Sequence, residues 1–355
     1  MNKIDKQANG PVRLGIIGTG EITRIMRPAF TGATESRVVA VADVNHQAAR
    51  TEADALGGAE AFADYRELLA HPEVQAVYIA TPPFLHREMV LAAMAAGKHV
   101  LCEKPFMLNQ AEAREIAAAH AATPGLKVAC CSSRFHAGTP VRKARELIAN
   151  GAIGRLQRIR FLHALPLPKP LAAMAPWKQK RATSGGGRLM DWGVYYLDWL
   201  RFLLGPLFDP AAIFARTENW CWEEGDIDSG FSAEILLGSG ISIGLECRVE
   251  HGPASKRVEV RGTGGGIDLP FMPDFSPAAL TLHRYDAENQ LHSETLSEPL
   301  TDWSSILHHP VRDFIDAILN DRDVASPPLS QVMIHGVIDA LYASAASNRS
   351  EEVKS

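Results

Sequence analysis

The chain is poor in cysteine, has no long apolar run and carries no large excess of either charge. Five cysteines in 355 residues are odd in number and scattered, mostly within apolar runs, which favours reduced core thiols over a disulfide framework. No apolar run approaches the ~20 residues that a membrane-spanning helix needs. The polar opening, residues 1–10, lacks the apolar core of a signal peptide, so we expect a cytoplasmic protein with no membrane partner.

Signals for nucleic-acid binding and for metal binding are also missing. A net charge of −5 without a basic stripe gives no reason to expect a nucleic-acid partner. The thirteen histidines form neither an HExxH motif nor a Cys/His ladder, and the adjacent His308 and His309 are poorly spaced for chelation, so we predict no metal. The composition, 46% hydrophobic and 22% charged, is that of an ordinary globular protein, whose length predicts about two domains.

A glycine turn near the start is the feature around which the rest of the chain is organised. Residues 12–17 have the pattern of an apolar strand, and Gly18, Thr19 and Gly20 follow as a tight turn before a helical pattern. Glycines are needed there because a Cβ would hold the backbone away from a pyrophosphate at the helix N-terminus. Thr23 stands at the third glycine position, so the motif indicates a dinucleotide site only in combination with a suitably placed acidic residue.

An acidic residue stands where a dinucleotide fold needs one. The strand pattern over residues 37–41 leads to Asp43, about twenty residues after the turn, where a carboxylate accepts hydrogen bonds from the adenosine ribose. A carboxylate there also repels a 2′-phosphate, which favours NAD over NADP, although NADP stays open. The alternative interpretation is an aspartate that only begins a turn.

Strand and helix patterns alternate through the first half of the chain. Strands are expected at 76–80, 99–102 and 127–131, and helices at 46–56, 65–71, 85–96 and 109–123. This rhythm predicts a doubly wound parallel sheet covered on both faces, whose ligands bind at the carboxyl ends of the strands. Gly18, Asp43, Thr81 and Glu103–Lys104 all fall at those ends.

Lys104 is the candidate acid/base group. It lies on a strand-end loop between Glu103 and Pro105, a place where function concentrates, and the X-Pro bond is a candidate for the cis form. In a water-poor crevice a lysine loses its proton more easily than its free pKa of ~10.4 suggests. It could then exchange a proton with a substrate hydroxyl while a nicotinamide takes the hydride. The alternative is a solvated surface lysine.

The second half has a different architecture. Alternation of apolar and polar residues over 241–249 predicts a half-buried antiparallel strand, joined by residues 238–240 to a strand at 231–237. The other elements expected are a helix at 140–150, strands from 156 and at 256–261, a strand-joining glycine loop at 262–266, and helices at 309–320 and 330–347. An open sheet must cover its second face, and packing against another subunit is one answer, so we expect a homo-oligomer.

A candidate catalytic helix lies between the two sheets, in SGGGRLMDWGVYYLDWLRFLLG at residues 184–205. Asp191, Tyr195 and Asp198 recur at spacings of four and three and should share one helix face. A carboxylate one turn from a phenol can hold two adjacent hydroxyls of a polyol. The alternatives are that Asp191 favours the positive helix end and that Tyr195 is a core aromatic residue.

Several motifs together resemble the Gfo/Idh/MocA family of NAD(P)-dependent sugar and polyol oxidoreductases. They are GTGEIT near the start, ATPPFLH at 80–86, GKHVLCEKP at 97–105, SGGGRLMDWGVYYLD from 184, and the closing SAASNRSEEV. The resemblance covers nearly the whole chain. It implies an N-terminal Rossmann domain, residues 1–133, and a C-terminal α/β domain, residues 134–355, with an open, mostly antiparallel sheet used for substrate binding and for dimers or tetramers.

The resemblance also implies roles for single residues. Lys104 matches the acid/base lysine of the family, and Asp191 binds substrate beside it. Many members carry histidine where this chain has Tyr195, which is similar to the branch of glucose-fructose oxidoreductase and dihydrodiol dehydrogenase and makes Tyr195 a proton donor or hydroxyl ligand. Further substrate contacts are expected from Trp177, Lys178 and Arg181, because these residues precede the glycines of the same segment. The cofactor-binding residues expected are Gly18, Thr19, Gly20, Glu21, Ile22, Asp43, Thr81, Pro82, His86, Glu103 and Lys104.

The leading hypothesis is reversible hydride transfer between a nicotinamide, NAD or alternatively NADP, and a secondary alcohol or hemiacetal carbon of a sugar or polyol. A second enzyme class remains open, because some relatives use bound NAD transiently while they cleave a glycosidic bond. A third hypothesis is a non-catalytic cofactor and sugar sensor. The sequence leaves the identity of the sugar and of the reacting carbon undecided.

Overall fold

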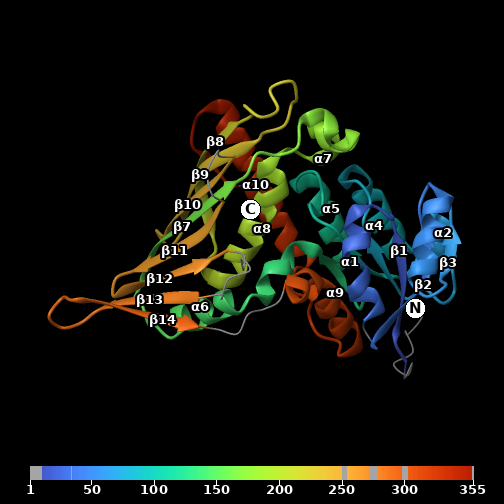
Figure 1. Ribbon diagram of the computed structural model, residues 1–355, viewed down its shortest axis with the longest axis horizontal. Helices are drawn as coiled ribbons and strands as arrows, with labels where there is room; N and C mark the ends of the chain where they lie inside the picture. Colours follow the sequence, from blue (N-terminus) through green and yellow to red (C-terminus); the bar gives the residue numbers. More distant parts are fainter. Residues whose placement is uncertain (1–9, 33, 250–253, 272–278, 298–302, 354–355) are drawn as a thin grey trace.

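The computed structural model describes residues 10–32, 34–249, 254–271, 279–297 and 303–353. The expectation that the chain has no signal peptide concerns residues 1–10, and of these only Gly10 belongs to the described residues. The chain builds two sheets, one near each end of the long axis, with helices between them (Figure 1). Within the described residues, no helix is long and apolar enough to cross a membrane.

The first sheet is parallel and confirms the expected doubly wound arrangement. Its six strands lie in the order β3-β2-β1-β4-β5-β6. The strands are β1 Val12–Ile17, β2 Ser36–Ala42, β3 Glu60–Phe62, β4 Ala76–Ile79, β5 His99–Cys102 and β6 Val128–Cys130. Every residue of β4 and β5 is buried, as expected where helices cover both faces of a parallel sheet. The order reverses between β1 and β4, where such sheets bind their ligands.

Three of the five α-helices of this half, α2, α3 and α5, begin after a residue whose side chain caps them. They are α1 Glu21–Thr31, α2 His46–Ala55, α3 Tyr65–Ala70, α4 His86–Ala95, preceded by the short helix η1 Pro83–Leu85, and α5 Gln110–Ala121. Asn109 caps α5, as expected, because its side chain accepts a hydrogen bond from the backbone N–H of Glu112 at 3.0 Å. Such a cap satisfies a backbone N–H that has no partner inside the helix.

Helix α9, Trp303–Leu319, returns from the second half of the chain to the first sheet. Its buried residues Val311, Phe314 and Ile315 share one apolar core with β1 and α1, and Figure 1 shows α9 beside α1. The expected start at residue 309 was wrong, because the helix begins at Trp303 and contains Pro310. A proline inside a helix removes one backbone hydrogen bond, and the fully buried Ile306 anchors the turns that precede it.

The second sheet has nine strands in the order β14-β13-β12-β11-β7-β10-β9-β8-β15. They are β7 Leu156–Leu165, β8 Pro210–Glu218, β9 Gly230–Leu237, β10 Ser242–Val249, β11 Ser255–Gly262, β12 Gly265–Pro270, β13 Ala279–Tyr285, β14 Leu291–Ser297 and β15 Glu351–Glu352. All neighbours are antiparallel except β7 and β10. The expected hairpin of β9 and β10 is confirmed, with Cys247 opposite Phe231.

One face of this sheet is covered by two long helices, and within the described residues no helix covers the other, which we call the bare face (Figure 1). Figure 1 shows α8, Arg188–Leu204, and α10, Pro328–Ser347, on the side that faces the first sheet. The inward residues of β10, which alternate along the strand, share one apolar core with both helices. The expected loop at 262–266 is shorter than predicted, because Gly262 ends β11 and Gly265 begins β12.

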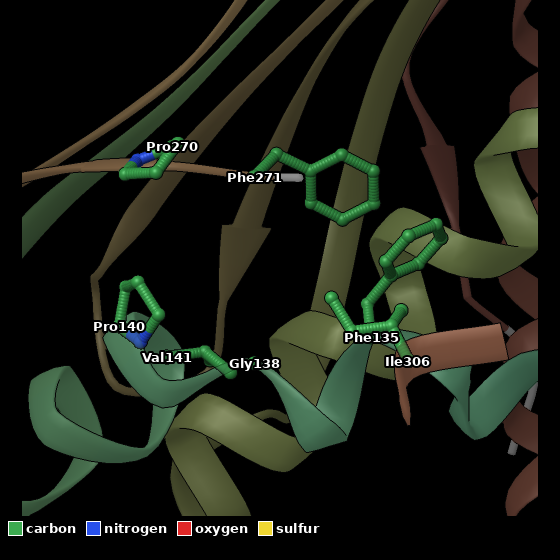
Figure 2. Close-up of a pocket in the computed structure, with 7 residues that line it drawn as sticks. All are labelled: Phe135, Gly138, Pro140, Val141, Pro270, Phe271 and Ile306. Atoms are coloured by element: carbon green, nitrogen blue, oxygen red, sulfur yellow. The ribbon is translucent and has the colours of Figure 1, made fainter. Parts of the chain in front are cut away.

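Two short helical segments connect the two sheets along the chain, η2 Cys131–Ala137 and α6 Thr139–Ala149. Further short segments lie between β7 and β8 of the second sheet, namely η3 Leu171–Ala173, η4 Pro176–Gln179, α7 Arg181–Ser184 and η5 Gly205–Leu207. An apolar cavity of about 10 Å³ lies between η2, the start of α6, the end of β12 and the start of α9, and Figure 2 shows the side chains around it. It is lined by Phe135, Gly138, Pro140, Val141, Pro270, Phe271 and Ile306. A void of this size holds about one water molecule, so a sugar must bind elsewhere.

Candidate active site

The glycine turn has the geometry that a pyrophosphate needs. Gly18 has a φ of +95°, and a Cβ there would lie 2.8 Å from the carbonyl oxygen of Ala80. A Cβ on Gly20, at the N-terminus of α1, would meet no atom within 4 Å, so this side of the turn is open. Thr23 donates its hydroxyl to the carbonyl oxygen of Gly18 at 2.7 Å, which explains a threonine at the third glycine position.

Asp43 faces this turn from the end of β2. Its Oδ2 accepts hydrogen bonds from the backbone N–H of Thr19 at 2.9 Å and from the Thr19 hydroxyl at 2.8 Å. Its Oδ1 accepts from the backbone N–H of Asn45 at 2.9 Å. The neighbouring Val44 is 96% exposed. The carboxylate therefore lies beside the turn, as the sequence predicts for a ribose ligand, and an apolar side chain stands next to it.

His86 was expected to bind the cofactor, but its ring is engaged within the protein. It is 1% exposed, and its ring nitrogens lie 2.9 Å from the carbonyl oxygen of Thr81 and 3.0 Å from that of Pro105. Burial lowers the pKa of His86, although these carbonyls act in the opposite direction. The ring therefore ties two strand-end loops together and is not available to a cofactor.

Lys104, Asp191 and Tyr195 come together although they are far apart in sequence. Lys104 Nζ donates to Oδ1 of Asp191 and, at 3.0 Å, to the Asp191 carbonyl oxygen. The same nitrogen lies 4.7 Å from the centre of the Tyr195 ring. Asp191 stands in the first turn of α8 and Tyr195 one turn later, while the Lys104–Pro105 bond is cis. The cluster sits just beyond the carboxyl end of β5.

The charge state of Lys104 is the reverse of the sequence expectation. Burial lowers the pKa of Lys104, but Asp191 and Tyr195 outweigh this effect, so the pKa is raised above its usual value. Enclosure in the crevice raises the pKa of Asp191, but Lys104 and Arg188 outweigh it and the pKa is lowered. The side chain of Asp191 keeps 49% of its surface, so a substrate can reach it. Lys104 is thus an ammonium donor next to an accessible carboxylate.

Arg134, in η2, is a site residue that the sequence reasoning missed. Its Nη1 donates to the Tyr195 hydroxyl oxygen at 2.5 Å, and its Nη2 donates to Oε1 of Glu103. Glu103 was expected to bind the cofactor, but its Oε1 is buried and also accepts from the Tyr78 hydroxyl at 2.7 Å. The only signal in the sequence was a charged residue just after an apolar strand pattern.

Asp198 shares a helix face with Asp191 but lies outside the cluster. Seven residues along a helix correspond to about 10 Å of rise, which carries Asp198 away from Lys104. It is fully buried and accepts hydrogen bonds from Ser132 at 2.6 Å and from Ser326 at 2.9 Å. Asp198 therefore holds the junction between η2 and the segment before α10.

The expected substrate residues Trp177 and Arg181 lie on the segment before α8. The guanidinium of Arg181 stacks 4.0 Å from the centre of the Tyr342 ring, and its backbone N–H donates to Asp226 at 2.8 Å. Trp177, in η4, has Lys178 Nζ 5.3 Å from its ring centre. These contacts do not involve the Lys104 cluster. Lys178 is the residue of this segment that acts on it, because its charge helps to lower the pKa of Asp191.

The start of α8 is fixed by a residue that the sequence reasoning also missed. A Cβ on Gly187 would collide with the backbone of Asp228, so glycine permits this close approach. The carboxylate of Asp228 then accepts from the backbone N–H groups of Gly187 at 2.9 Å and of Leu189 at 2.6 Å. Satisfying these groups at the helix N-terminus holds the turn that carries Asp191 in place.

The residues expected to bind a cofactor and those expected to bind a substrate therefore lie at one edge of the first sheet. The glycine turn and Asp43 follow β1 and β2, and Lys104 follows β5. Asp191 and Tyr195 reach the same edge from α8. Within the described residues, no three His, Cys, Asp or Glu side chains gather where they could hold a metal ion. The polar groups gathered there are the Lys104 ammonium, the Asp191 carboxylate and the Tyr195 phenol, which accepts a hydrogen bond from the guanidinium of Arg134.

Two family models match the chain. The one described as the oxidoreductase family with an NAD-binding Rossmann fold covers residues 12–129, and the one described as the GFO/IDH/MocA C-terminal domain covers residues 141–268. Among curated proteins, the chain is 32% identical to 1,5-anhydro-D-fructose reductase of Ensifer adhaerens over 280 residues, which are 79% of this chain and 82% of that protein.

Solved structures share the fold over almost the whole length. A crystal structure of an NAD binding oxidoreductase from Klebsiella pneumoniae is 25% identical, with a TM-score of 0.85 over 98% of this chain and 100% of that one. Levoglucosan dehydrogenase in complex with NADH and L-sorbose is 23% identical, with a TM-score of 0.82 over 97% of this chain and 99% of that one. The two-sheet architecture of Figure 1 is thus shared with nicotinamide-binding proteins.

Proposed function

We propose, from the premise that this chain belongs to the GFO/IDH/MocA family of oxidoreductases, that it transfers a hydride reversibly between a nicotinamide and a secondary alcohol or hemiacetal carbon of a sugar or polyol. It is an NAD(P)-dependent oxidoreductase that acts on CH–OH groups, with an NAD-binding Rossmann domain. The observation that carries the finer proposal is the meeting of Lys104, Asp191 and Tyr195 beyond the end of β5.

The residues of the first sheet suit a dinucleotide. The open backbone at Gly20 and the free N–H groups at the start of α1, from Glu21 and Ile22, would hold the pyrophosphate. Asp43 would accept from the ribose hydroxyls, and Thr81 and Pro82, at the next strand end, would lie along the nicotinamide half. The bound nicotinamide would supply the hydride acceptor or donor. In this proposal residues 1–133 bind the cofactor and residues 134–355 bind the substrate.

Each member of the cluster then has one task. Asp191 accepts a hydrogen bond from a substrate hydroxyl and positions it. Lys104 remains an ammonium and donates to the oxygen on the reacting carbon, which stabilises negative charge there. In oxidation Tyr195 acts in its ionised form: the tyrosinate takes the substrate O–H proton and becomes the neutral phenol, while the C–H hydrogen leaves as a hydride. In reduction the neutral phenol returns the proton and both steps reverse.

A substrate scan tests this function. Aldoses, polyols and cyclic diols are supplied with NAD while the absorbance of reduced nicotinamide is recorded, and active compounds are repeated with deuterium on the reacting carbon. We expect a sugar-like alcohol to reduce the cofactor and to transfer its deuterium to it. Cleavage of a glycoside without net reduction of NAD would support the glycoside-cleaving alternative instead. Tight cofactor binding with no turnover on any compound would oppose the proposal.

Cofactor preference depends on Asp43 in this proposal. Asp43→Ala removes the ribose acceptor and the repulsion of a 2′-phosphate, so we expect the ratio of kcat/KM for NAD to that for NADP to fall roughly tenfold or more. The ratio is measured with both cofactors at one substrate concentration. Asp54→Ala, at an exposed position of α2, is the matched control. A ratio that stays at the wild-type value in Asp43→Ala would contradict the assigned role.

The bare face of the second sheet is proposed to pair with further copies of the chain, giving a homodimer or homotetramer. Phe214 of β8 and Leu236 of β9 are 39% and 48% exposed on that face. We expect Phe214→Glu combined with Leu236→Glu to shift the light-scattering mass towards that of a monomer, since two charges would be buried at the interface. Leu329→Glu, at a 76% exposed position of α10, should leave the mass unchanged. A monomeric wild type would exclude the proposal.

A further inference from the structure

A buried series of side chains runs from the core of the first sheet to the phenol of Tyr195. Tyr78 in β4 donates its hydroxyl to Oε1 of Glu103 at 2.7 Å, and Arg134 donates Nη2 to the same oxygen. Through Nη1, Arg134 also donates to the Tyr195 hydroxyl oxygen at 2.5 Å. Arg134 therefore links the residue beside Lys104 to the phenol by two direct hydrogen bonds.

The ion pair of Arg134 and Glu103 in this series is deeply buried next to the candidate active site. The side chains of Arg134 and Glu103 keep 3% and 5% of their surface. An ion pair so deeply buried is weak evidence for stability, because lost hydration offsets the attraction between the charges. Tyr195 is 6% exposed and belongs to the cluster of Lys104 and Asp191. The bond from Arg134 to Tyr195 is thus the point at which the series reaches the candidate active site.

The direction of each hydrogen bond follows from the groups themselves. A guanidinium can only donate, so the Tyr195 oxygen accepts from Arg134 and its single proton points elsewhere. Phe135 packs edge-on against the Tyr195 ring at 4.9 Å, and Lys104 Nζ lies 4.7 Å from its centre. The ring is therefore held by its neighbours while the hydroxyl proton is left for a substrate. Lys104 is engaged by Asp191, whereas Arg134 bonds the phenol oxygen directly.

We propose that Arg134 is a positioning residue for proton transfer by Tyr195. Its guanidinium holds the phenol oxygen, directs the O–H bond towards the substrate oxygen and stabilises the negative charge that remains when the proton leaves. The inference rests on the proposed function, in which Tyr195 exchanges the proton. In oxidation the substrate would give its O–H proton to the ionised Tyr195, which becomes the neutral phenol, and its hydride to the nicotinamide, so no other reactant is needed.

The charges that face Tyr195 act on its pKa in opposite directions. Burial raises the pKa of Tyr195, Arg134 lowers it more than Lys104 does, and Glu103 raises it. Loss of Arg134 should therefore move the ionisation of Tyr195 to higher pH, and neutralisation of Glu103 should move it to lower pH. Substitutions at Arg134 and at Glu103 would then shift the pKa of Tyr195 in opposite directions. An ion pair with a purely structural role would not have this effect.

The experiment compares Arg134→Gln, Arg134→Lys and Glu103→Gln with the wild type in pH profiles of kcat for alcohol oxidation. We expect Arg134→Gln to shift the inflection to higher pH and to lower kcat at neutral pH roughly 10- to 100-fold, with partial rescue in Arg134→Lys. Glu103→Gln should shift the inflection to lower pH. Ultraviolet difference titration of tyrosinate, with the Tyr195→Phe spectrum subtracted, follows the ionisation without any turnover.

The inference is overturned if the inflection of the kcat profile and the tyrosinate titration both stay at the wild-type pH in Arg134→Gln and in Glu103→Gln. This holds even if kcat falls in these variants. If Arg134→Gln does not fold, Arg134→Lys and Glu103→Gln make the same comparison. In the Tyr195→Phe background, Arg134→Gln should cost no further kcat, because the group it positions is gone. Full activity of Tyr195→Phe would instead defeat the proposed proton transfer, so the two failures are distinguishable.

Discussion

Lys104→Met is expected to lower kcat by roughly 10³- to 10⁴-fold, because it removes the ammonium that we propose to donate to the reacting oxygen and leaves the Asp191 carboxylate with Arg188 but without its lysine partner. Methionine keeps much of the length of lysine without its charge, so the packing against Tyr195 is largely preserved. The rate is measured with saturating cofactor and the best substrate from the scan. Cofactor affinity, measured by fluorescence titration, should change much less than kcat.

The matched control for this substitution is Lys143→Met on α6. The Lys143 side chain keeps 37% of its surface and pairs with Glu146, away from the cluster, so its loss should leave kcat unchanged. Equal rates for Lys104→Met and the wild type would remove Lys104 from the mechanism. A loss in both variants to the same degree would point to a general effect of removing lysine charge.

The Lys104–Asp191 pair also gives stability a defined pH dependence. The pKa of Asp191 is lowered, so its contribution to the free energy of unfolding is present above its ordinary pKa of ~3.9 and is lost as pH falls through the lower folded value. The pKa of Lys104 is raised, so its contribution is present below ~10.4 and is lost as pH rises through the folded value. In Lys104→Met the loss of unfolding free energy at low pH and the loss at high pH should both be smaller than in the wild type. Denaturant titrations at several pH values would detect this difference.

Tyr195→Phe is expected to lower kcat by roughly 10²- to 10³-fold, with a much smaller change in KM, because only the group that exchanges the proton is removed. The ring that packs against Phe135 and lies beside Lys104 is retained. Tyr285→Phe, at a 56% exposed position of β13, is the control and should behave as the wild type.

The pKa of Tyr195 predicts the direction in which the reaction rates change with pH. Burial raises the pKa of Tyr195 above its usual value of ~10, and Arg134 and Lys104 only partly oppose this. The neutral phenol therefore predominates from about pH 6 to 9, so reduction of a carbonyl should be nearly independent of pH there, while oxidation of an alcohol should accelerate as pH rises. Tyr195→Phe should lose this acceleration. A wild-type oxidation rate that falls with increasing pH would contradict the role of Tyr195.

Much of the fold could be predicted from local patterns. The strands that became β1, β4 and β5 are short apolar runs, and the alternation in β10 marks a half-buried antiparallel strand. The start of α9 could not be predicted, because Pro310 usually marks the first turn of a helix. Packing of Ile306 and Phe314 against distant parts of the chain overrides that local preference.

The candidate site divides in the same way. Lys104, Asp191 and Tyr195 could be named from motifs, and they do meet, although 87 residues separate Lys104 from Asp191. The contacts of the His86 ring with the carbonyl oxygens of Thr81 and Pro105 could not be predicted, because they are a property of the folded loops. Arg134 was missed because no spacing in the sequence connects it to Tyr195, which lies 61 residues further along the chain.

The sequence by itself determined the alternating elements and the glycine turn, because periodic burial and turn formation depend on neighbouring residues. Its motifs also named the three side chains that we propose to carry the chemistry. The tertiary structure alone decided that Lys104 stays charged and that a buried arginine holds the phenol. Those outcomes depend on the charges and the burial around each group, and these come from segments that only folding brings together.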